Sequence, residues 1–339
     1  MRRIAWLPLA LLSACADSPS NSPGNYRHYY TIDGLARETL VYVPQSASGS
    51  TAVPVVFMFH GTSGDGRKFY EISGWREKAD AEGLIAVFPS ALTHCLKEDD
   101  NHDGDFDDAG ELKVTTKWAA GKLGDPARMP LCTAEELAGL TPERRALADH
   151  PLADDVAFVR AMLDDLASQY AIDTRRIYAT GFSNGGSFTS RLAVEMADRF
   201  AAVAAASGGL DVDPVPGARP IPFVFSGGNL DDRVTEALGV TSLPLDESLL
   251  GFAPIEELVG GYLAALGLDA EHSFTLRNLS GRSVAQLDYT TSVAGSGAGN
   301  FFSFMIIDGL GHQYPNGKNH PVVMADELWE VFRAESLPE

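Results

Sequence analysis

The 339-residue sequence is poor in basic residues, poor in cysteine and without an apolar run long enough to cross a bilayer. It has 26 Lys and Arg against 46 Asp and Glu, which gives a formal net charge of −20. A partner such as DNA or RNA needs cations that neutralise its phosphates, so this balance argues against nucleic-acid binding. With ordinary Gly and Pro contents and 45% hydrophobic residues, the composition is that of a soluble globular protein.

The N-terminus carries a short apolar run, Ile4–Leu12, directly after two arginines. This is the pattern of a secretory signal. The tetrad that ends at Cys15 also resembles the bacterial lipoprotein box, in which the cysteine is lipidated and becomes the new N-terminus. We therefore predict a signal peptide over residues 1–15, lipidation at Cys15 and a flexible tether over 16–26. An ordinary cleaved signal is the alternative.

This start predicts an exported protein, either secreted or held at the cell envelope, at the outer membrane, by the lipid. The lipid is the only membrane contact expected. Once Cys15 is lipidated, two cysteines remain, Cys95 and Cys132. Two cysteines in an oxidising compartment predict a disulfide, and two separate buried thiols are the alternative.

Apolar runs of strand length alternate with segments of helical spacing through most of the chain. Strands followed by helices predict an α/β fold with a doubly wound, mostly parallel sheet. This alternation of strands and helices is lost over residues 89–150, which we interpret as an insertion. The sequence shows no internal repeat and no second core. We therefore expect one catalytic domain over 27–337. The predicted strands are 29–31, 39–43, 53–59, 83–88, 177–179, 201–206, 222–225 and 301–307, and the predicted helices are 69–82, 154–170, 184–199 and 322–334.

The strongest motif is Gly181-Phe182-Ser183-Asn184-Gly185, between a predicted strand and a predicted helix. A Gly-x-Ser-x-Gly in this context forms a tight turn that lifts the serine hydroxyl above the sheet edge. A serine hydroxyl needs a base and a carboxylate before it can act as a nucleophile. We predict that Ser183 is the nucleophile; a glycine-rich turn whose serine caps a helix is the alternative.

The base is predicted to be His312, in a glycine-rich loop directly after the apolar strand 301–307. The acid should follow an earlier strand in the order Ser, Asp, His. Both Asp231 and Asp232 follow the strand 222–225; Asp231 is preferred and Asp232 is the alternative, with Asp211 a distant third. We expect His320 to be a surface loop residue.

The loop after the strand 53–59 begins with His60-Gly61-Thr62. A flexible loop at this place can direct a backbone N–H toward the oxyanion of an acyl-transfer reaction, together with the first N–H of the following helix. We predict that the N–H groups of Thr62 and Asn184 form this oxyanion hole. His60 is expected to be structural and to pack under the loop.

These motifs, with Asp155-Val156-Ala157-Phe158-Val159, resemble the polyhydroxybutyrate depolymerase and feruloyl esterase family of α/β-hydrolases. The resemblance runs from about residue 30 to the C-terminal helix. It implies an α/β-hydrolase fold, a secreted serine esterase, and the roles of Ser183, Asp231 and His312. The loops of the acid and the base depart from the family pattern. Because both loops line the cleft, the departures leave the substrate open.

The sequence 99–110 is an acidic run with the spacing of a calcium-binding loop. Its potential oxygen ligands are Asp99, Asn101, Asp103, Asp105 and Asp107. The ligand expected at the last position is replaced by Gly110, so Asp108 or Glu111 would have to complete the site. We predict a structural calcium ion; a solvated charged loop is the alternative.

The leading functional hypothesis is a serine carboxylic ester hydrolase without a catalytic cofactor, acting on polyhydroxyalkanoate-type or phenolic (feruloyl) esters. An acyltransferase or peptidase with the same triad is the first alternative, and a non-catalytic surface-binding lipoprotein is the second. Residues 235–298, between acid and base, are expected to form part of the cleft wall.

Overall fold

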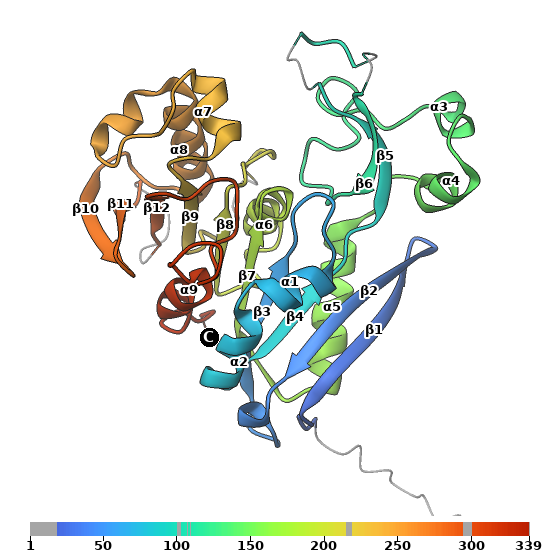
Figure 1. Cartoon of the computed structure of the whole chain (residues 1–339). Helices are drawn as coiled ribbons and strands as arrows, with labels where there is room; N and C mark the ends of the chain where they lie inside the picture. Colours follow the sequence, from blue (N-terminus) through green and yellow to red (C-terminus); the bar gives the residue numbers. More distant parts are fainter. Residues whose placement is uncertain are drawn as a thin grey trace, which may run out of the picture.

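The computed structural model describes residues 19–99, 103–106, 108, 110–214, 219–293 and 300–338, which form a sheet covered by helices on both faces (Figure 1). The strands are β1 (Gly24–Ile32), β2 (Leu35–Val43), β3 (Val53–Phe59), β4 (Ile85–Pro89), β5 (Thr93–Lys97), β6 (Leu112–Thr116), β7 (Ile172–Phe182), β8 (Ala202–Ala206), β9 (Phe223–Gly228), β10 (His272–Leu279), β11 (Arg282–Tyr289) and β12 (Phe302–Ile307). The α-helices are α1 (Gly66–Ile72), α2 (Trp75–Glu82), α3 (Ala134–Ala138), α4 (Pro142–Ala148), α5 (Asp155–Gln169), α6 (Asn184–Glu195), α7 (Asp232–Leu238), α8 (Ala253–Leu266) and α9 (Met324–Phe332). Short 3-10 turns are η1 (Gln45–Ala47) and η2 (Glu247–Gly251).

The main sheet has the strand order β1-β2-β4-β3-β7-β8-β9-β12-β11-β10. From β4 to β12 every neighbouring pair runs parallel, whereas β1, β2, β11 and β10 extend the two ends as antiparallel strands. Parallel neighbours need crossovers, and the helices between them provide these on both faces. The predicted doubly wound, mostly parallel sheet is confirmed.

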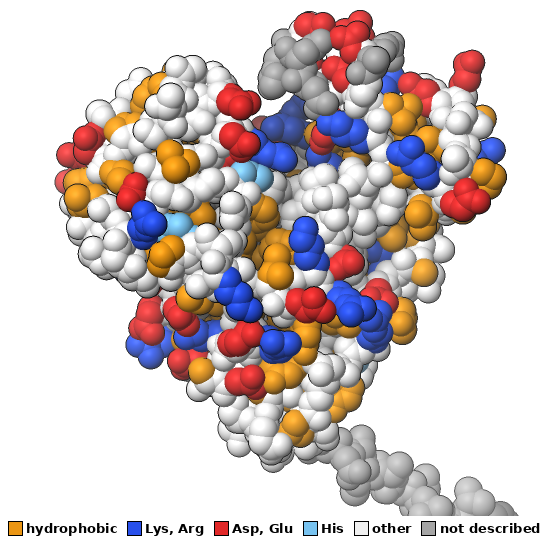
Figure 2. Space-filling view, in the orientation of Figure 1, with side chains coloured by type: hydrophobic (Ala, Val, Ile, Leu, Met, Phe, Trp, Pro, Cys, Tyr) orange, Lys and Arg blue, Asp and Glu red, His pale blue; other side chains and the backbone are white. Residues whose placement is uncertain are grey.

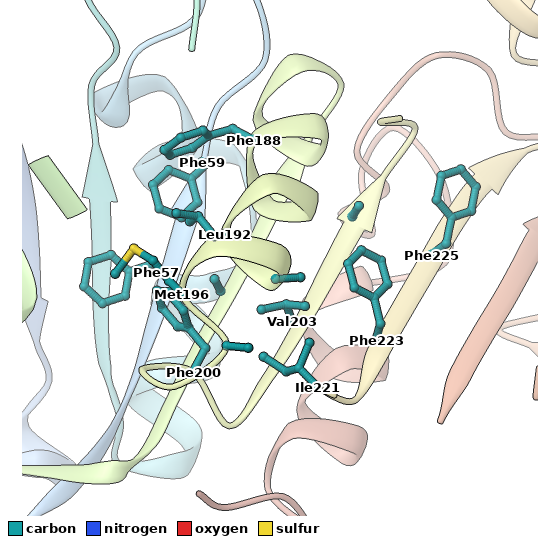
Figure 3. Close-up of a cluster of buried hydrophobic side chains, with 14 of the residues drawn as sticks. Phe57, Phe59, Phe188, Leu192, Met196, Phe200, Val203, Ile221, Phe223 and Phe225 are labelled. Carbon is teal, nitrogen blue, oxygen red and sulfur yellow. The ribbon is translucent and has the colours of Figure 1, made fainter. Parts of the chain in front are cut away.

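The core lies on both faces of the central strands. Along β3, Phe57 and Phe59 point into one cluster, under α5, α6 and α8, and Val56 and Met58 into another, under α1, α2 and α9. Successive side chains of a strand point to opposite faces, so a strand that is apolar throughout is buried on both. Figure 3 shows the first cluster, in which the rings of Phe59 and Phe188 lie together and those of Phe223 and Phe225 lie along β9.

Helix α5 shows how sequence pattern leads to packing. Its first turn is capped by Asp154, whose side chain accepts a hydrogen bond from the N–H of Ala157 at 2.8 Å. Its buried face carries Phe158, Val159, Met162 and other apolar residues at helical spacing. Each such side chain stabilises the fold by roughly 1.5–3 kcal/mol when fully buried.

Several predicted elements need correction. The segment 69–82 is not one helix, because Gly74 adopts a left-handed conformation (φ 80°) between α1 and α2. The predicted strand at 177–179 is part of the much longer β7. The predicted strands 29–31 and 39–43 are parts of the antiparallel hairpin β1–β2, which turns at Asp33-Gly34. The structure also has α8, β10 and β11 in a region for which the sequence predicted no elements.

The segment 89–150 leaves the sheet after β4 and returns at α5. It contains the small β5–β6 sheet and the helices α3 and α4. Cys95 and Cys132 are joined by a disulfide, with Cα atoms 5.3 Å apart. The cross-link ties β5 to the chain just before α3.

The described chain begins at the amino end of the central strands. The side chain of Asn21 donates to the carbonyl of Ala171 and accepts from its N–H, at 3.0 and 2.9 Å, directly before β7. Its backbone also pairs with Gly49. No helix in the part of the chain that the structure describes has the length and apolar character to cross a membrane.

Candidate active site

Ser183 stands at the turn between β7 and α6. Its backbone has φ 53° and ψ −122°, a sparsely populated conformation that costs about 1–3 kcal/mol and clusters at functional sites. Glycines on both sides make the turn possible. A Cβ on Gly181 would lie 2.1 Å from the carbonyl oxygen of Gly185, and one on Gly185 would lie 2.3 Å from that of Phe59. The turn therefore has no room for a side chain at position 181 or 185.

The structure brings Ser183, His312 and Asp231 together. His312 Nε2 lies 2.9 Å from Ser183 Oγ, and His312 Nδ1 lies 2.8 Å from Asp231 Oδ2. Because a carboxylate can only accept, Nδ1 carries the ring proton and Nε2 is free to accept from the serine hydroxyl. The Asp231 side chain is 3% exposed and that of His312 is 16% exposed, so the end nearest the serine stays open to a substrate.

The alternative acids lie elsewhere. Asp232 is the first residue of α7, is exposed, and accepts from the N–H of Arg233 at 3.1 Å. Asp211 forms ion pairs with Lys122 and Arg128 at 3.0 and 3.2 Å. Neither is bonded to His312.

Asn229 holds the loops of Asp231 and His312 together, a part that the sequence analysis missed. Its side chain accepts from the N–H of Gly309 at 2.8 Å, and its own N–H donates to the carbonyl of Ile307 at 3.0 Å. A Cβ on Gly228 would lie 2.0 Å from the carbonyl oxygen of Leu310. The two loops thus touch through backbone, because their strands β9 and β12 are neighbours in the sheet.

Thr62 and Asn184 line the same cleft as Ser183 and His312. Neither backbone N–H donates a hydrogen bond to any described residue. Asn184 is the first residue of α6, and the first N–H groups of a helix have no partner within it. Both predicted oxyanion donors are therefore available to a ligand in the cleft.

Comparison with known proteins points to esterases. A model of the prolyl oligopeptidase family matches residues 144–223, which include Ser183. The putative esterase NocK of Nocardia uniformis subsp. tsuyamanensis is 25% identical over 295 residues, covering 84% of this chain and 73% of NocK. Feruloyl esterase B of Piromyces equi is 26% identical over 203 residues, covering 58% of this chain and 30% of that protein.

Among solved structures, an acetyl xylan esterase from Aspergillus awamori matches with a TM-score of 0.53, 16% identity and coverage of 91% and 99%. This likeness shows the α/β-hydrolase fold. These relatives support the resemblance to the polyhydroxybutyrate depolymerase and feruloyl esterase family. The chain is a serine hydrolase of the carboxylic ester hydrolase type.

In this esterase the insertion 89–150 supports the loop that carries Thr62. The N–H of Ser63 donates to the carbonyl of Thr116 at 3.0 Å, and the Thr116 hydroxyl donates to the carbonyl of Gly64 at 2.7 Å. The Asn184 side chain accepts from the N–H of Trp118 at 2.7 Å and donates to its carbonyl at 3.1 Å. The insertion is thereby fastened to both predicted oxyanion donors.

The cleft of the esterase has a volume of about 1280 Å³ and two unlike walls. One wall, formed by β9, α7, the loop after α7, α8 and β12, contributes apolar side chains, namely Phe225, Val234, Ala237, Leu243, Ile255, Leu258, Phe304 and Ile306. The wall from the insertion contributes Lys113, Lys117, Lys122 and Arg128 beside Trp118 and Leu123. Figure 2 shows the hollow between the two walls, with a histidine and several basic side chains in it.

His60 and His320 have structural positions. The ring of His60 is buried, accepts from the N–H of Ala91 at 3.0 Å and donates to the carbonyl of Gly61 at 2.7 Å. Burial lowers the pKa of His60 to about 4, which keeps the ring neutral. His320 is not a surface residue as predicted: it is 4% exposed and bridges Asp308 and Val322.

Two predicted ligands of the calcium loop, Asn101 and Asp107, lie outside the described residues, as do Cys15 and the rest of residues 1–18. Among the described residues, both carboxylate oxygens of Asp99 accept backbone N–H groups, from Asp103 and Gly104, at 3.1 and 3.0 Å. No group of three or more His, Cys, Asp or Glu in the described chain is placed to hold a metal ion. The calcium site stays a prediction.

Proposed function

We propose that the esterase cleaves its substrate through an acyl-enzyme on Ser183. The observation that carries this proposal is the hydrogen-bonded chain from Ser183 through His312 to Asp231. His312 Nε2 takes the hydroxyl proton while Ser183 Oγ bonds to the acyl carbon. Asp231 keeps the imidazole oriented and stabilises the imidazolium that forms.

The negative charge of the tetrahedral intermediate develops on the former carbonyl oxygen. The N–H groups of Thr62 and Asn184 stabilise it, and such donors are each worth about 10²–10³ in kcat. When the intermediate collapses, His312 protonates the leaving alcohol. Water then attacks the acyl-enzyme with His312 as base, which releases the acid and restores Ser183.

The substrate class that the cleft supports best is an ester with a sizeable apolar part, of the phenolic (feruloyl) or polyhydroxyalkanoate type. Phe225, Phe304 and Ile306 lie in the wall that would contact this part. The similarity to Feruloyl esterase B supports the phenolic choice. The enzyme is exported, with a lipid on Cys15 as its envelope anchor.

The test is hydrolysis of p-nitrophenyl butyrate, p-nitrophenyl octanoate, methyl ferulate and a polyhydroxybutyrate film, by the wild type and by Ser183→Ala. Serine-dependent turnover is expected, with a loss of several orders of magnitude in the variant. A prolyl p-nitroanilide belongs in the panel, because the family model that matches residues 144–223 contains peptidases. Faster cleavage of the anilide than of every ester would show that the enzyme is a peptidase and not an esterase.

A fluorophosphonate probe separates a weak enzyme from a non-catalytic scaffold. Labelling is expected in the wild type and absent in Ser183→Ala. A wild type that neither labels nor turns over any ester would overturn the proposed function.

A further inference from the structure

Directly beside the proposed acid, the cleft contains a cation that has no partner among the described residues. Arg233 is the second residue of α7 and lines the cleft together with Ser183 and His312. Its backbone N–H donates to Asp231 and Asp232 at 3.2 and 3.1 Å. Its guanidinium forms no hydrogen bond or ion pair with any residue that the structure describes. Five donors of a permanently charged group thus remain available in the cleft.

The insertion wall, across the cleft, also carries cations. Lys113 and Lys117 both pair with Glu98, and Lys122 and Arg128 both pair with Asp211. Burial alone would raise the pKa of Glu98, but the two ammonium groups outweigh it and lower that pKa, so Glu98 is a carboxylate.

The charge balance of the cleft differs from that of the whole chain. The lining has five Lys and Arg, and apart from Asp231 it has four carboxylates, Glu98, Asp99, Asp211 and Glu236. The chain has 26 Lys and Arg against 46 Asp and Glu. With Asp231 included, the described lining has five carboxylates and is balanced in charge, so an anion meets less repulsion there than at the acidic outer surface.

We propose that Arg233 binds a carboxylate of the substrate, so that the ester cleaved by this enzyme has both an apolar part and an ionised carboxylate. A planar guanidinium matches a carboxylate through two parallel N–H···O bonds. This inference rests on the proposed function and narrows its substrate class. Arg233 selects among esters, whereas Ser183 and His312 perform the chemistry on all of them.

The carboxylate can belong to the acyl part or to the alcohol, and two matched pairs of esters distinguish these. The acyl pair is mono-p-nitrophenyl glutarate and p-nitrophenyl valerate. The alcohol pair is para-carboxybenzyl acetate and para-methylbenzyl acetate. In each pair a carboxylate replaces a methyl group. The quantity measured is kcat/KM of the charged ester divided by kcat/KM of the neutral one, for the wild type, Arg233→Gln, Arg233→Lys and Arg144→Gln.

For one of the two pairs, the wild-type ratio is expected to exceed that of Arg233→Gln by about tenfold to a hundredfold, the range of a hydrogen-bonded charge pair. The change should appear mainly in KM. Arg233→Lys should recover part of it, and Arg144→Gln, an exposed arginine of α4 outside the cleft, should keep the wild-type ratio. A ratio cancels any general effect of the substitution on the neighbouring Asp231.

Equal ratios in wild type and Arg233→Gln for both pairs, with Ser183-dependent turnover intact, would overturn the anion site and leave the esterase standing. Loss of Ser183-dependent turnover for every ester would overturn the proposed function, and this inference with it.

Discussion

The carboxyl edge of the sheet and the insertion 89–150 hold the site in two different ways. At the sheet edge, backbone touches backbone: Gly185 lies against Phe59, and Gly228 against Leu310, with no space for a Cβ. The insertion instead reaches the site through individual hydrogen bonds, from Thr116 to Gly64 and between Trp118 and Asn184, and through one buried ring, that of Trp118. The sheet edge therefore sets where Ser183, His312 and Asp231 lie, and the insertion sets the loop and the wall that face them.

The difference has a thermodynamic consequence. Close backbone packing at the sheet edge is part of the core and is lost only with global unfolding. The parts of the insertion that are held by hydrogen bonds alone can open locally at a lower free energy. Variants in the two regions should therefore separate effects on the chemistry from effects on the insertion.

The largest change expected concerns the disulfide. The double variant Cys95→Ser, Cys132→Ser removes a cross-link between residues that are 37 positions apart. Loop-closure entropy predicts a loss of about 4 kcal/mol in the free energy of unfolding. Urea unfolding with and without reductant measures this loss. An unfolding midpoint equal to that of the oxidised wild type would show that the cross-link does not stabilise the insertion.

The next change breaks the sheet edge. Gly185→Ala places a methyl group 2.3 Å from the carbonyl oxygen of Phe59 and displaces the turn of Ser183. A misplacement of this order costs about 10²-fold in kcat. Gly260→Ala is the matched control, since Gly260 lies within α8 with open space around it and should gain up to about 1 kcal/mol of stability. Equal kcat values for the two variants would contradict the steric account.

The third prediction uses pH to weaken the hydrogen bond between His60 and Ala91, which lies at the start of the insertion. His60 must be neutral to accept from Ala91, and its folded pKa of about 4 lies below the unfolded value of about 6.5. The contribution of neutral His60 to the free energy of unfolding is complete above the unfolded pKa and is lost as the pH falls toward 4. Between pH 7 and 5 this contribution falls by about 2 kcal/mol. Over that range the free energy of unfolding, measured in urea, should therefore fall by about 2 kcal/mol less in His60→Gln than in the wild type. Parallel pH profiles for the two proteins would refute it.

The smallest effect expected is on the link from α6 to the insertion. Asn184→Ala keeps the N–H of the proposed oxyanion hole but removes both side-chain bonds to Trp118. We expect kcat to fall about tenfold with little change in KM, because the donor is less well positioned in the transition state. Asn25→Ala, an exposed asparagine of β1, serves as the control. A change in KM alone would assign the Trp118 contact to substrate binding instead.

The parts of the site that were predicted lie in short motifs. Ser183 could be identified because the glycines beside it form a local pattern with a steric cause. His312 and Asp231 could be proposed from their places after apolar strands, since parallel strands bring their carboxyl ends to one edge. The sheet itself follows from runs such as 53–59, which are apolar at every position.

What was missed depends on contacts between distant residues. Trp118 and Asn184 are 66 positions apart, and Asn229 and Gly309 are 80 apart. No periodicity connects such pairs, because each hydrogen bond depends on the packing of two loops. Two further misses concern local patterns. Gly74 fitted a helical spacing, so the break between α1 and α2 was not predicted. His320 stands in a polar stretch of sequence, so its burial was not predicted.

The position of Asn21 has a geometric consequence for any attachment through the N-terminus. Its side chain holds the chain at Ala171, before β7, and Ser183 follows the other end of that strand. Eleven residues of strand span roughly 36 Å. Asn21 therefore lies at the pole opposite the cleft, so that attachment to a surface through the residues before it would leave the cleft facing away from that surface, toward the medium.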